Sequence, residues 1–371
     1  MTLPSGRTSA RERAHPDAAE VVAVLKAQGV DEADASPLAR AMYSSDASIY
    51  RVPPLVVVRP RHPDELEAVL DVVRGTGVPL TMRGAGTSIA GNAVGRGIVM
   101  DTSRHLNRVL HLDPDERTAR VQPGTVHATV QRAAAAQGLR FGPDPSTHTR
   151  CTVGGMIGNN ACGSRALGYG RTSDNVVSLR AVTVDGRPVA DLAAAAAALV
   201  DEHLGVVRTR FGRFSRQVSG YAMEHLLPEN GRSLDRFLVG SEGTLAVVTE
   251  ATVRLVEDTP HRVLAVLGYP SMAEAADAVP ALLTHRPVAC EGLDHRITAM
   301  VPTRPPLPHG SGWLLVETTG DTSAEAVARA EGVVADSGAL DARVVADVPE
   351  QLALWRIRED GAGLASRATR P

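Results

Sequence analysis

The sequence has few aromatic residues, few cysteines and almost no lysine. Of its 371 residues, 3% are aromatic, and the three cysteines, Cys151, Cys162 and Cys290, form no C-x-x-C pair. An odd number of isolated cysteines argues against a disulfide framework or a structural zinc site and favours a reducing compartment. Lys26 is the only lysine, so arginine supplies nearly all of the positive charge. Arginine suits bidentate recognition of carboxylate or phosphate, although genomic base composition is the simpler explanation.

Charge and hydropathy argue against two further classes of protein. The formal net charge is −3, so no basic surface favours nucleic-acid binding. No apolar run approaches the length of a membrane-spanning helix, and the alanine-rich stretch near residues 190–200 is short and predicts an ordinary helix. Residues 1–20 are polar and arginine-rich and lack the apolar segment of a secretory signal. We therefore expect a cytoplasmic protein.

Hydrophobic periodicity predicts three consecutive regions. Residues 1–50 would form a loose tail followed by a helix at 18–30. Residues 51–257 contain short apolar runs, a few helical patterns and long glycine-rich stretches. Residues 258–371 alternate strands and helices and stop soon after a helix that begins near Glu350. An α/β domain that ends there is shorter than usual, so we expect the third region to be incomplete.

The second region opens with a strand–helix–strand pattern. The β-branched run at 55–58 predicts a buried strand, a helix begins after His62, and 78–82 is the next strand. Such a unit favours a parallel pair of strands. The other expected elements are strands at 98–100, 118–122 and 176–184, a helix at 125–137, a mainly helical insertion at about 190–233, and a strand–turn–strand at 237–256.

A glycine-rich loop follows the strand at 78–82. It reads Arg83-Gly84-Ala85-Gly86-Thr87-Ser88. Glycine lets the backbone approach a ligand, and successive N–H groups in such a turn bind anions, so the loop suits a pyrophosphate. The alternatives are a tight turn without a ligand and a Rossmann dinucleotide site. The Rossmann fingerprint needs a glycine where Ile89 stands, and further glycines interrupt the crossover helix that would lead to Asp101 and its ribose contact.

Two more glycine-rich loops follow in order. One runs from Gly142 to Gly163 and continues into Gly168-Tyr169-Gly170-Arg171-Thr172, and the other reads Val239-Gly240-Ser241-Glu242-Gly243-Thr244-Leu245. Together with the first loop, they resemble the FAD-binding domain of the vanillyl-alcohol oxidase and p-cresol methylhydroxylase (PCMH) superfamily, and within it the D-lactate, glycolate and D-2-hydroxyglutarate dehydrogenases. Three loops in the right order make the resemblance specific. It covers about residues 43–257 well and 258–371 more loosely.

The resemblance implies a fold and a set of cofactor contacts. The fold is α+β, with a two-subdomain PCMH-type FAD-binding domain followed by an incomplete α/β substrate (cap) domain. Around the FAD pyrophosphate we expect Arg83, Gly84, Ala85, Gly86, Thr87 and Ser88. Along the flavin and its phosphates we expect Pro143, Asp144, Pro145 and Ser146. Near the isoalloxazine and ribityl chain we expect Thr152, Gly154, Gly155, Asn159 and Gly163, and at the adenine Gly243 and Val248.

The resemblance also indicates that FAD is bound without a covalent link. Some members of the superfamily tether FAD through a histidine in the first loop, where this sequence has Thr87 and Ser88. Cys151 and Cys162 lie in the second loop, but a free cysteine usually packs as a small hydrophobic residue. Asn159-Asn160 is also open to another interpretation, since asparagine commonly forms turns.

The catalytic residues are less clearly marked. A 2-hydroxy acid needs an arginine for its carboxylate, and the segment Trp355-Arg356-Ile357-Arg358-Glu359 resembles the family segment whose arginine before glutamate has that role. Arg358 is therefore the expected catalytic residue, and a solvated charge pattern on a helix is the alternative. The family's metal-binding and base histidines belong to a later Gly-Asp-Gly-rich segment that we do not find. The histidines present have no ligand spacing, so no metal site is expected.

The sequence thus predicts an FAD-dependent oxidoreductase that oxidises a small D-2-hydroxy acid by hydride transfer to the flavin. The alternative is a non-catalytic FAD-binding subunit or remnant of such a complex. The electron acceptor would be a quinone, an electron-transfer flavoprotein or an iron–sulfur protein. Any iron–sulfur cluster would belong to a missing C-terminal half or a partner, because the required cysteine pattern is absent. Any peripheral association with a membrane would also be through a partner.

Overall fold

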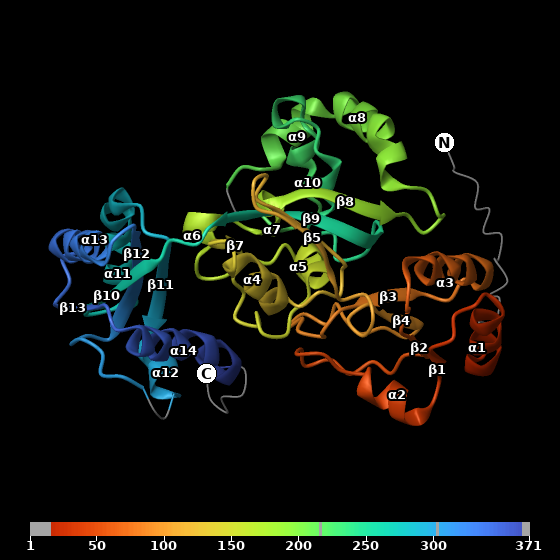
Figure 1. The fold of residues 1–371 in the computed structure, drawn as a ribbon, viewed down its shortest axis with the longest axis horizontal. Helices are drawn as coiled ribbons and strands as arrows, with labels where there is room; N and C mark the ends of the chain where they lie inside the picture. Colours follow the sequence, from red (N-terminus) through yellow and green to blue (C-terminus); the bar gives the residue numbers. More distant parts are fainter. Residues whose placement is uncertain (1–15, 215–216, 302–303, 366–371) are drawn as a thin grey trace, which may run out of the picture.

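The protein folds into three β-sheets with helices packed against them (Figure 1). The structure is a computed structural model that describes residues 16–214, 217–301 and 304–365. Of the predicted tail at residues 1–20, residues 1–15 lie outside these ranges, whereas residues 18–20 already belong to the first helix. Figure 1 shows the third sheet as a separate unit on one side, with the first two sheets next to each other on the other side. The fold is therefore mixed helix and sheet, as the sequence predicts.

The first sheet is built from short, buried strands. Its order is β1 (Ala33–Asp34), β2 (Val56–Val58), β4 (Ile98–Asp101) and β3 (Leu80–Arg83). Helices α1 (Ala18–Ala27) and α3 (Pro63–Thr76) share the sheet's apolar cluster, while α2 (Pro37–Met42) leads from β1 towards β2. The predicted parallel pair of β2 and β3 is wrong in one respect. Both strands are parallel to β4, which lies between them, because all four β4 residues are buried and occupy the sheet centre.

The second sheet is antiparallel and is organised around one long strand. β9 (Val247–Glu257) pairs with β6 (Thr118–Val121), β7 (Leu139–Phe141) and β8 (Val176–Val182), and β5 (Val109–Asp113) pairs with β6. Helices α4 (His127–Ala135) and α5 (Val153–Asn159) contribute to its core, which includes Phe141, Met156 and Val253. Two short helices, α6 (Ala166–Tyr169) and α7 (Thr172–Asn175), lie between α5 and β8.

The predicted helical insertion follows β8. It contains a 3-10 turn at Val189–Leu192, helices α8 (Ala193–Glu202) and α9 (Leu204–Arg210), and two further 3-10 turns at Met223–Leu226 and Pro228–Asn230. The predicted strand at the start of 237–256 is wrong. That stretch is the end of α10 (Leu234–Leu238), because the Ser233 side chain accepts a hydrogen bond from the N–H of Arg236 and begins a helix there. The second predicted strand is the observed β9.

The third sheet has the order β11 (Ala289–Asp294), β12 (Gly312–Gly320), β10 (His261–Tyr269) and β13 (Asp341–Val345), and every pair is antiparallel. Helices α11 (Met272–Leu282) and α13 (Ser323–Asp336) pack on one face. Helix α14 (Val348–Ala365) packs on the other face, with α12 (His295–Ala299) beside it (Figure 1). The predicted alternation of strands and helices is thus observed, but the strands form a βαββαβ arrangement rather than parallel units.

Candidate cofactor site

A cavity of about 230 Å³ lies where the three glycine-rich loops meet. The loop after β3, the segment leading into α5, and the turn between α10 and β9 all contribute to its wall. Most of the residues that the sequence assigns to a cofactor line this cavity: Arg83, Gly84, Ala85, Gly86, Thr87, Ser88, Pro145, Thr152, Gly154, Gly155, Asn159, Gly243 and Val248. Residues up to 165 positions apart in the sequence are therefore brought together at one site, from Arg83 to Val248.

The first loop offers free hydrogen-bond donors. Within the part of the chain that the structure describes, the backbone N–H groups of Ala85, Gly86, Thr87 and Ser88 have no acceptor. The loop is held in place from outside: Ala47 N donates to the Gly86 carbonyl at 3.1 Å. Gly86 has a φ of 67°, which favours glycine. Such a row of N–H groups is suited to an anion.

Arg83 fixes the same loop through its side chain. Its Nη1 donates to the Ala93 carbonyl at 2.9 Å, and its guanidinium lies over the Tyr43 ring at 5.1 Å. The Arg83 side chain thus connects the start of the loop with Ala93 and with Tyr43 outside the loop. A Cβ at Gly84 would overlap the Thr152 side chain, so the first and second loops are in direct contact and leave no room for a side chain at Gly84.

The second loop leads into α5, whose first N–H groups are all used within the protein. Val153 N donates to Thr125 O at 2.9 Å, and Gly154 N donates to Pro123 O at 2.7 Å. The Thr152 hydroxyl accepts from Gly155 N at 3.2 Å and caps the helix. The start of α5 thus has no free donor for a phosphate, and the free donors are those of the first loop.

The third loop packs directly on α5. Gly240 N donates to the Ile157 carbonyl at 2.8 Å, and Glu242 N donates to the Gly158 carbonyl at 2.9 Å. Three of the four residues from 240 to 243 have positive φ: Gly240 (90°), Glu242 (54°) and Gly243 (74°). Glu242 is the unusual member, because a side chain other than glycine is strained there. The strain is located at the cavity wall.

Four of the predicted cofactor residues are not among the described residues that line the cavity: Pro143, Asp144, Ser146 and Gly163. The Pro143 carbonyl accepts from His127 Nε2 at 2.7 Å, and Asp144 forms an ion pair with Arg165. Gly163 packs against Asp144 with a φ of 141°, and a Cβ there would overlap it. Pro143, Asp144 and Gly163 therefore contact protein groups outside the cavity lining, and Ser146 is exposed.

The cavity wall also includes residues that the sequence does not single out: Met82, Ile89, Asn92, Ala93, Thr102, Pro123, Thr147, Cys151, Met156, Ile157, Gly158, Ala161, Leu238, Ser241, Glu242 and Ala246. Several are neighbours of predicted residues in the same loops, so loop membership alone could have identified them. Thr102 and Pro123 follow β4 and β6, and only the tertiary fold brings them to the site. Cys151 is buried, and burial raises the pKa of its thiol to about 11.

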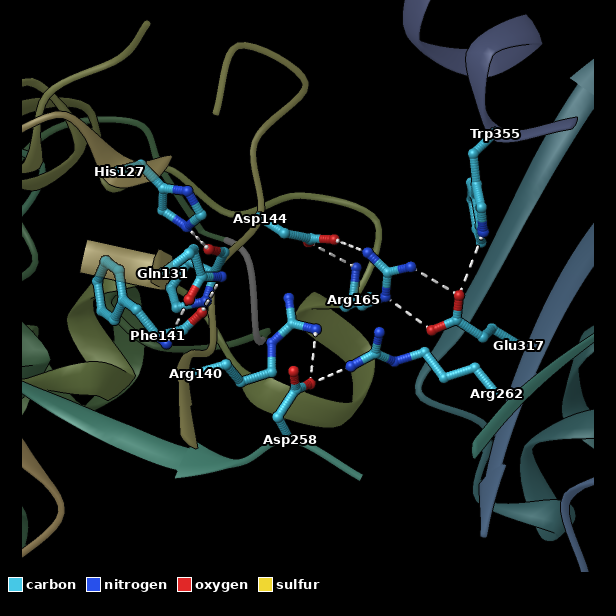
Figure 2. A network of polar contacts seen from close by, with 11 residues as sticks. His127, Gln131, Arg140, Phe141, Asp144, Arg165, Asp258, Arg262, Glu317 and Trp355 are labelled. Atoms are coloured by element: carbon cyan, nitrogen blue, oxygen red, sulfur yellow. Dashed lines mark hydrogen bonds and ion pairs between the residues drawn. The ribbon is translucent and has the colours of Figure 1, made fainter. Parts of the chain in front are cut away.

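His127 supports the second loop from α4. It is almost completely buried, and burial lowers its pKa to about 4, although the bond to Pro143 opposes this shift. The imidazole is therefore neutral near pH 7. Since Nε2 faces a carbonyl, Nε2 carries the proton, and Nδ1 has no partner among the described residues. Gln131, one helical turn away, exchanges two hydrogen bonds with the backbone of Phe141 (Figure 2).

The structure contradicts the Rossmann alternative. Asp101, which would hold a ribose in that site, is buried and already used: its carboxylate accepts from the Tyr43 hydroxyl at 2.6 Å and from Ser103 N and Oγ at 2.7 Å each. The segment between β3 and β4, all of it described, contains bends and turns but no helix. A pyrophosphate there would have no crossover helix to bind.

Arg358 lies on α14, away from the cavity lining. Its Nε donates to Glu291 Oε2 on β11 at 3.0 Å, and about a quarter of each side chain is exposed. Among the described residues, no three His, Cys, Asp or Glu side chains are grouped so that they could hold a metal ion. None of the helices described here is long and apolar enough to cross a membrane.

Two known protein families match the chain. The FAD binding domain family matches residues 54–190, and the C-terminal domain family of the FAD linked oxidases matches residues 259–370. The D-2-hydroxyglutarate dehydrogenase of Pseudomonas putida is 32% identical over 335 residues, which is 80% of this chain and 33% of that protein. The glycolate oxidase subunit GlcD of Bacillus subtilis is 32% identical over 276 residues, 73% of this chain and 52% of that protein.

The D-lactate dehydrogenase of Archaeoglobus fulgidus is 35% identical over 244 residues, 65% of this chain and 48% of that protein. The chain therefore spans between a third and about half of the length of these curated relatives. Among solved structures, an alkyldihydroxyacetonephosphate synthase matches with a TM-score of 0.68 at 18% identity, over 93% of this chain and 65% of that one.

The BBE-like 1 protein of Physcomitrella patens matches with a TM-score of 0.61 at 12% identity, over 91% of this chain and 64% of that one. At such identities these two structures show the fold alone. The two matched families occur in the order that the sheets follow, with the FAD binding domain first. The chain therefore belongs to the FAD-linked oxidases, with an FAD binding domain followed by their C-terminal domain.

Proposed function

We propose that the chain binds FAD without a covalent link and acts in the oxidation of a small D-2-hydroxy acid. The observation that carries the proposal is the cavity formed by three glycine-rich loops, one of which presents the unused N–H groups of Ala85, Gly86, Thr87 and Ser88. The relatives named above as dehydrogenases and oxidases of 2-hydroxy acids support the same conclusion.

The residues at the cavity fit a flat, dianionic cofactor. The N–H groups of the first loop would bind the pyrophosphate. The missing side chains at Gly84 and Gly154 let Thr152 and Pro123 pack closely behind the cavity wall. Binding pockets for whole organic ligands usually measure about 300–1,000 Å³. The cavity of about 230 Å³ would therefore enclose one part of FAD, with the rest along the more exposed first loop. Gly243 and Val248 are our candidates for the adenine end.

Two observations support non-covalent binding. None of the described residues that line the cavity is a histidine. Cys151 does line it, but with a pKa of about 11 its thiol stays protonated near neutral pH, and the thiol is a far weaker nucleophile than the thiolate. Cys151 would therefore not form a covalent link to FAD unless its environment changed.

Hydride acceptance from the carbon that carries the substrate hydroxyl is the chemistry that bound FAD would supply. The contribution of this chain is to hold and orient the substrate. We assign recognition of the substrate carboxylate to Arg358, because a guanidinium forms paired hydrogen bonds with a carboxylate. Glu291 now occupies that position, so a substrate would have to displace it or share the arginine.

A second candidate function is that of an FAD-binding subunit that does not itself turn over substrate. One observation favours it: the relative from Bacillus subtilis is named as a subunit of glycolate oxidase. In either case the electron acceptor would be a quinone, an electron-transfer flavoprotein or an iron–sulfur protein. We also propose a reducing, cytoplasmic location, because an odd number of isolated cysteines argues against a disulfide framework.

The deciding experiment is the visible spectrum of the purified protein before and after acid precipitation. We expect a flavin band that moves completely into the supernatant. D-lactate, glycolate and D-2-hydroxyglutarate are then added anaerobically, with L-lactate as the matched control. Bleaching by a D-acid or glycolate supports the oxidoreductase, and bound flavin that none of them bleaches supports the subunit. A folded protein that stays colourless after incubation with FAD contradicts both.

A further inference from the structure

A buried carboxylate–arginine–carboxylate bridge connects the wall of the cavity with the third sheet (Figure 2). Arg165, which precedes α6, donates from Nε and Nη2 to the two carboxylate oxygens of Glu317, each at 2.7 Å. Its Nη1 and its backbone N donate to the two oxygens of Asp144, at 2.7 and 2.9 Å. One guanidinium thus binds two carboxylates from distant parts of the chain, and each of these carboxylates receives two bonds from Arg165.

The bridge is buried at both ends. The exposed fraction of the side chain is 1% for Glu317, 10% for Asp144 and 20% for Arg165. Burial alone would lower the pKa of Arg165, but its bonds to Glu317 and Asp144 outweigh burial and raise it. For Asp144 burial prevails over the arginine and raises the pKa of the carboxyl. Charges that are buried this deeply depend on each other, because removal of one leaves the others without compensation.

Each end of the bridge is attached to a functional element. On the cavity side, Pro145 and Thr147 lie one and three positions after Asp144 and line the cavity. On the other side, Glu317 lies in β12 and accepts a further bond from Trp355 Nε1 at 3.2 Å. Trp355 belongs to α14, the helix that also carries Arg358. A continuous series of hydrogen bonds therefore runs from α14 to the segment at the cavity.

We propose that Arg165 is a positioning residue that couples the C-terminal domain to the cavity wall. Through its bonds to Asp144 it holds the segment 143–147 in place, and it does so only while Glu317 holds the guanidinium. A change in α14 or β12, such as one caused by substrate near Arg358, is thereby transmitted to the cofactor environment. That this environment is a flavin site rests on the proposed function, whereas the coupling itself does not.

A second group of ion pairs joins the domains without any atom of 143–147. Asp258, between β9 and β10, accepts from Arg140 Nη1 of β7 at 3.5 Å and also from Arg262 Nη2 of β10 (Figure 2). This group can keep the domains together when the bridge is broken. A variant of the bridge therefore tests the coupling and need not separate the two domains.

The test is hydrogen–deuterium exchange on the full chain with Glu317→Gln. We expect exchange in segment 143–151 to rise by at least about tenfold, because a buried arginine loses its charged partner. The matched control is Glu229→Gln in the insertion, where Arg208 Nε and Nη2 bind Glu229 in the same two-pronged geometry at 2.8 and 3.0 Å but at the exposed surface. The control should leave that segment unchanged.

A second variant covers the case in which Glu317→Gln does not fold. Asp144→Asn breaks the bridge at the cavity end and keeps the bond between Arg165 and Glu317. It should also raise exchange in 143–151, and the double variant Asp144→Asn/Glu317→Gln should raise it no further than either single one. Full additivity of the two changes, or faster exchange confined to β12 and α14, would overturn the proposal.

The flavin supplies a readout that a purely structural role would not change. In variants that bind FAD, we expect the visible absorption bands and the midpoint potential of the bound flavin to shift in Glu317→Gln and to stay constant in Glu229→Gln. An unchanged flavin in a Glu317→Gln protein with faster exchange would overturn the transmission to the cofactor. If the wild-type protein binds no FAD, the proposed function fails, while the exchange experiment still decides the coupling.

Discussion

Glu291 and Arg358 form an ion pair between β11 and α14, in which Arg358 Nε donates to Glu291 Oε2 over 3.0 Å. The arginine that we assign to the substrate carboxylate therefore already binds a carboxylate of the protein. Both side chains are partly exposed, so the pair contributes at most about 1 kcal/mol. A substrate carboxylate can compete with a bond of that strength.

The first prediction follows from this competition. Glu291→Gln should lower KM for a D-2-hydroxy acid by about twofold to fivefold with little change in kcat, because the arginine is no longer occupied by a charged partner. Steady-state kinetics measure both constants. Asp294→Asn is the matched control, since it breaks an exposed pair with Arg296 at the end of the same strand. A KM that rises in Glu291→Gln would mean that Glu291 itself helps to bind the substrate.

The second prediction concerns the first loop. Gly86→Ala should weaken FAD binding at least tenfold, because Gly86 has a φ of 67° and an added Cβ would overlap the Arg83 guanidinium. Strain of this kind costs about 1–3 kcal/mol. Gly77→Ala is the control: Gly77 has a φ of 70° at the end of α3, with no atom near the position of a Cβ. Both variants should lose stability in denaturant, and only Gly86→Ala should lose affinity in an FAD fluorescence titration.

The third prediction concerns stability against pH. The pKa of His127 is about 4 in the folded protein and about 6.5 in the unfolded chain, and its titratable or charged neighbours His148 and Arg140 both act in the direction of burial. Between these values only the unfolded chain binds the proton, so the free energy of unfolding falls as pH decreases from 6.5 to 4. For this residue alone the loss from pH 7 to pH 5 is about 2 kcal/mol.

His127→Gln should remove that share of the pH dependence in denaturant unfolding. It should leave FAD affinity nearly unchanged, because the glutamine amide can still donate to Pro143. His225→Gln is the control for the effect of the cavity. Burial also lowers the pKa of His225 to about 4, but His225 lies in the insertion, away from the cavity lining. A His127→Gln protein with the wild-type pH dependence would show that other groups are responsible.

The sequence predicts most of those elements that have one clear period and a marked end. The strand at β2 and the helix at α3 are examples, since a β-branched run is bracketed by prolines and Gly77 ends the helix in a left-handed conformation. β5 and β11 are not predicted, because their residues are mostly half-buried and mix polar with apolar side chains. The last two residues of α10, Phe237 and Leu238, are mistaken for the start of a strand, because a helix of only five residues has no clear period.

The cavity is predictable to a similar extent. Glycine marks the first and second loops, and most of the residues assigned from them line one cavity. What the sequence does not reveal is which polar residue of a loop faces the ligand and which faces the protein. Asp144 lies in a loop with the composition of a phosphate-binding loop. Its carboxylate nevertheless binds Arg165, which also binds Glu317, and so belongs to a buried bridge instead of the cavity lining. That outcome depends on a strand 173 positions later in the chain, which no local pattern can contain.

The last prediction separates two roles of Thr152, which caps α5 and lines the cavity. Thr152→Val should cost about 1 kcal/mol of stability, because the Gly155 N–H loses its acceptor. Thr152→Ser should keep the cap. Ser271→Ala removes a comparable cap at Glu274 N of α11, away from the cavity lining, and serves as the control for stability alone. If the Thr152 hydroxyl also contacts the cofactor, Thr152→Val should weaken FAD binding in a titration while Ser271→Ala does not. Equal FAD affinities of the two variants would mean that the Thr152 hydroxyl serves only to cap the helix.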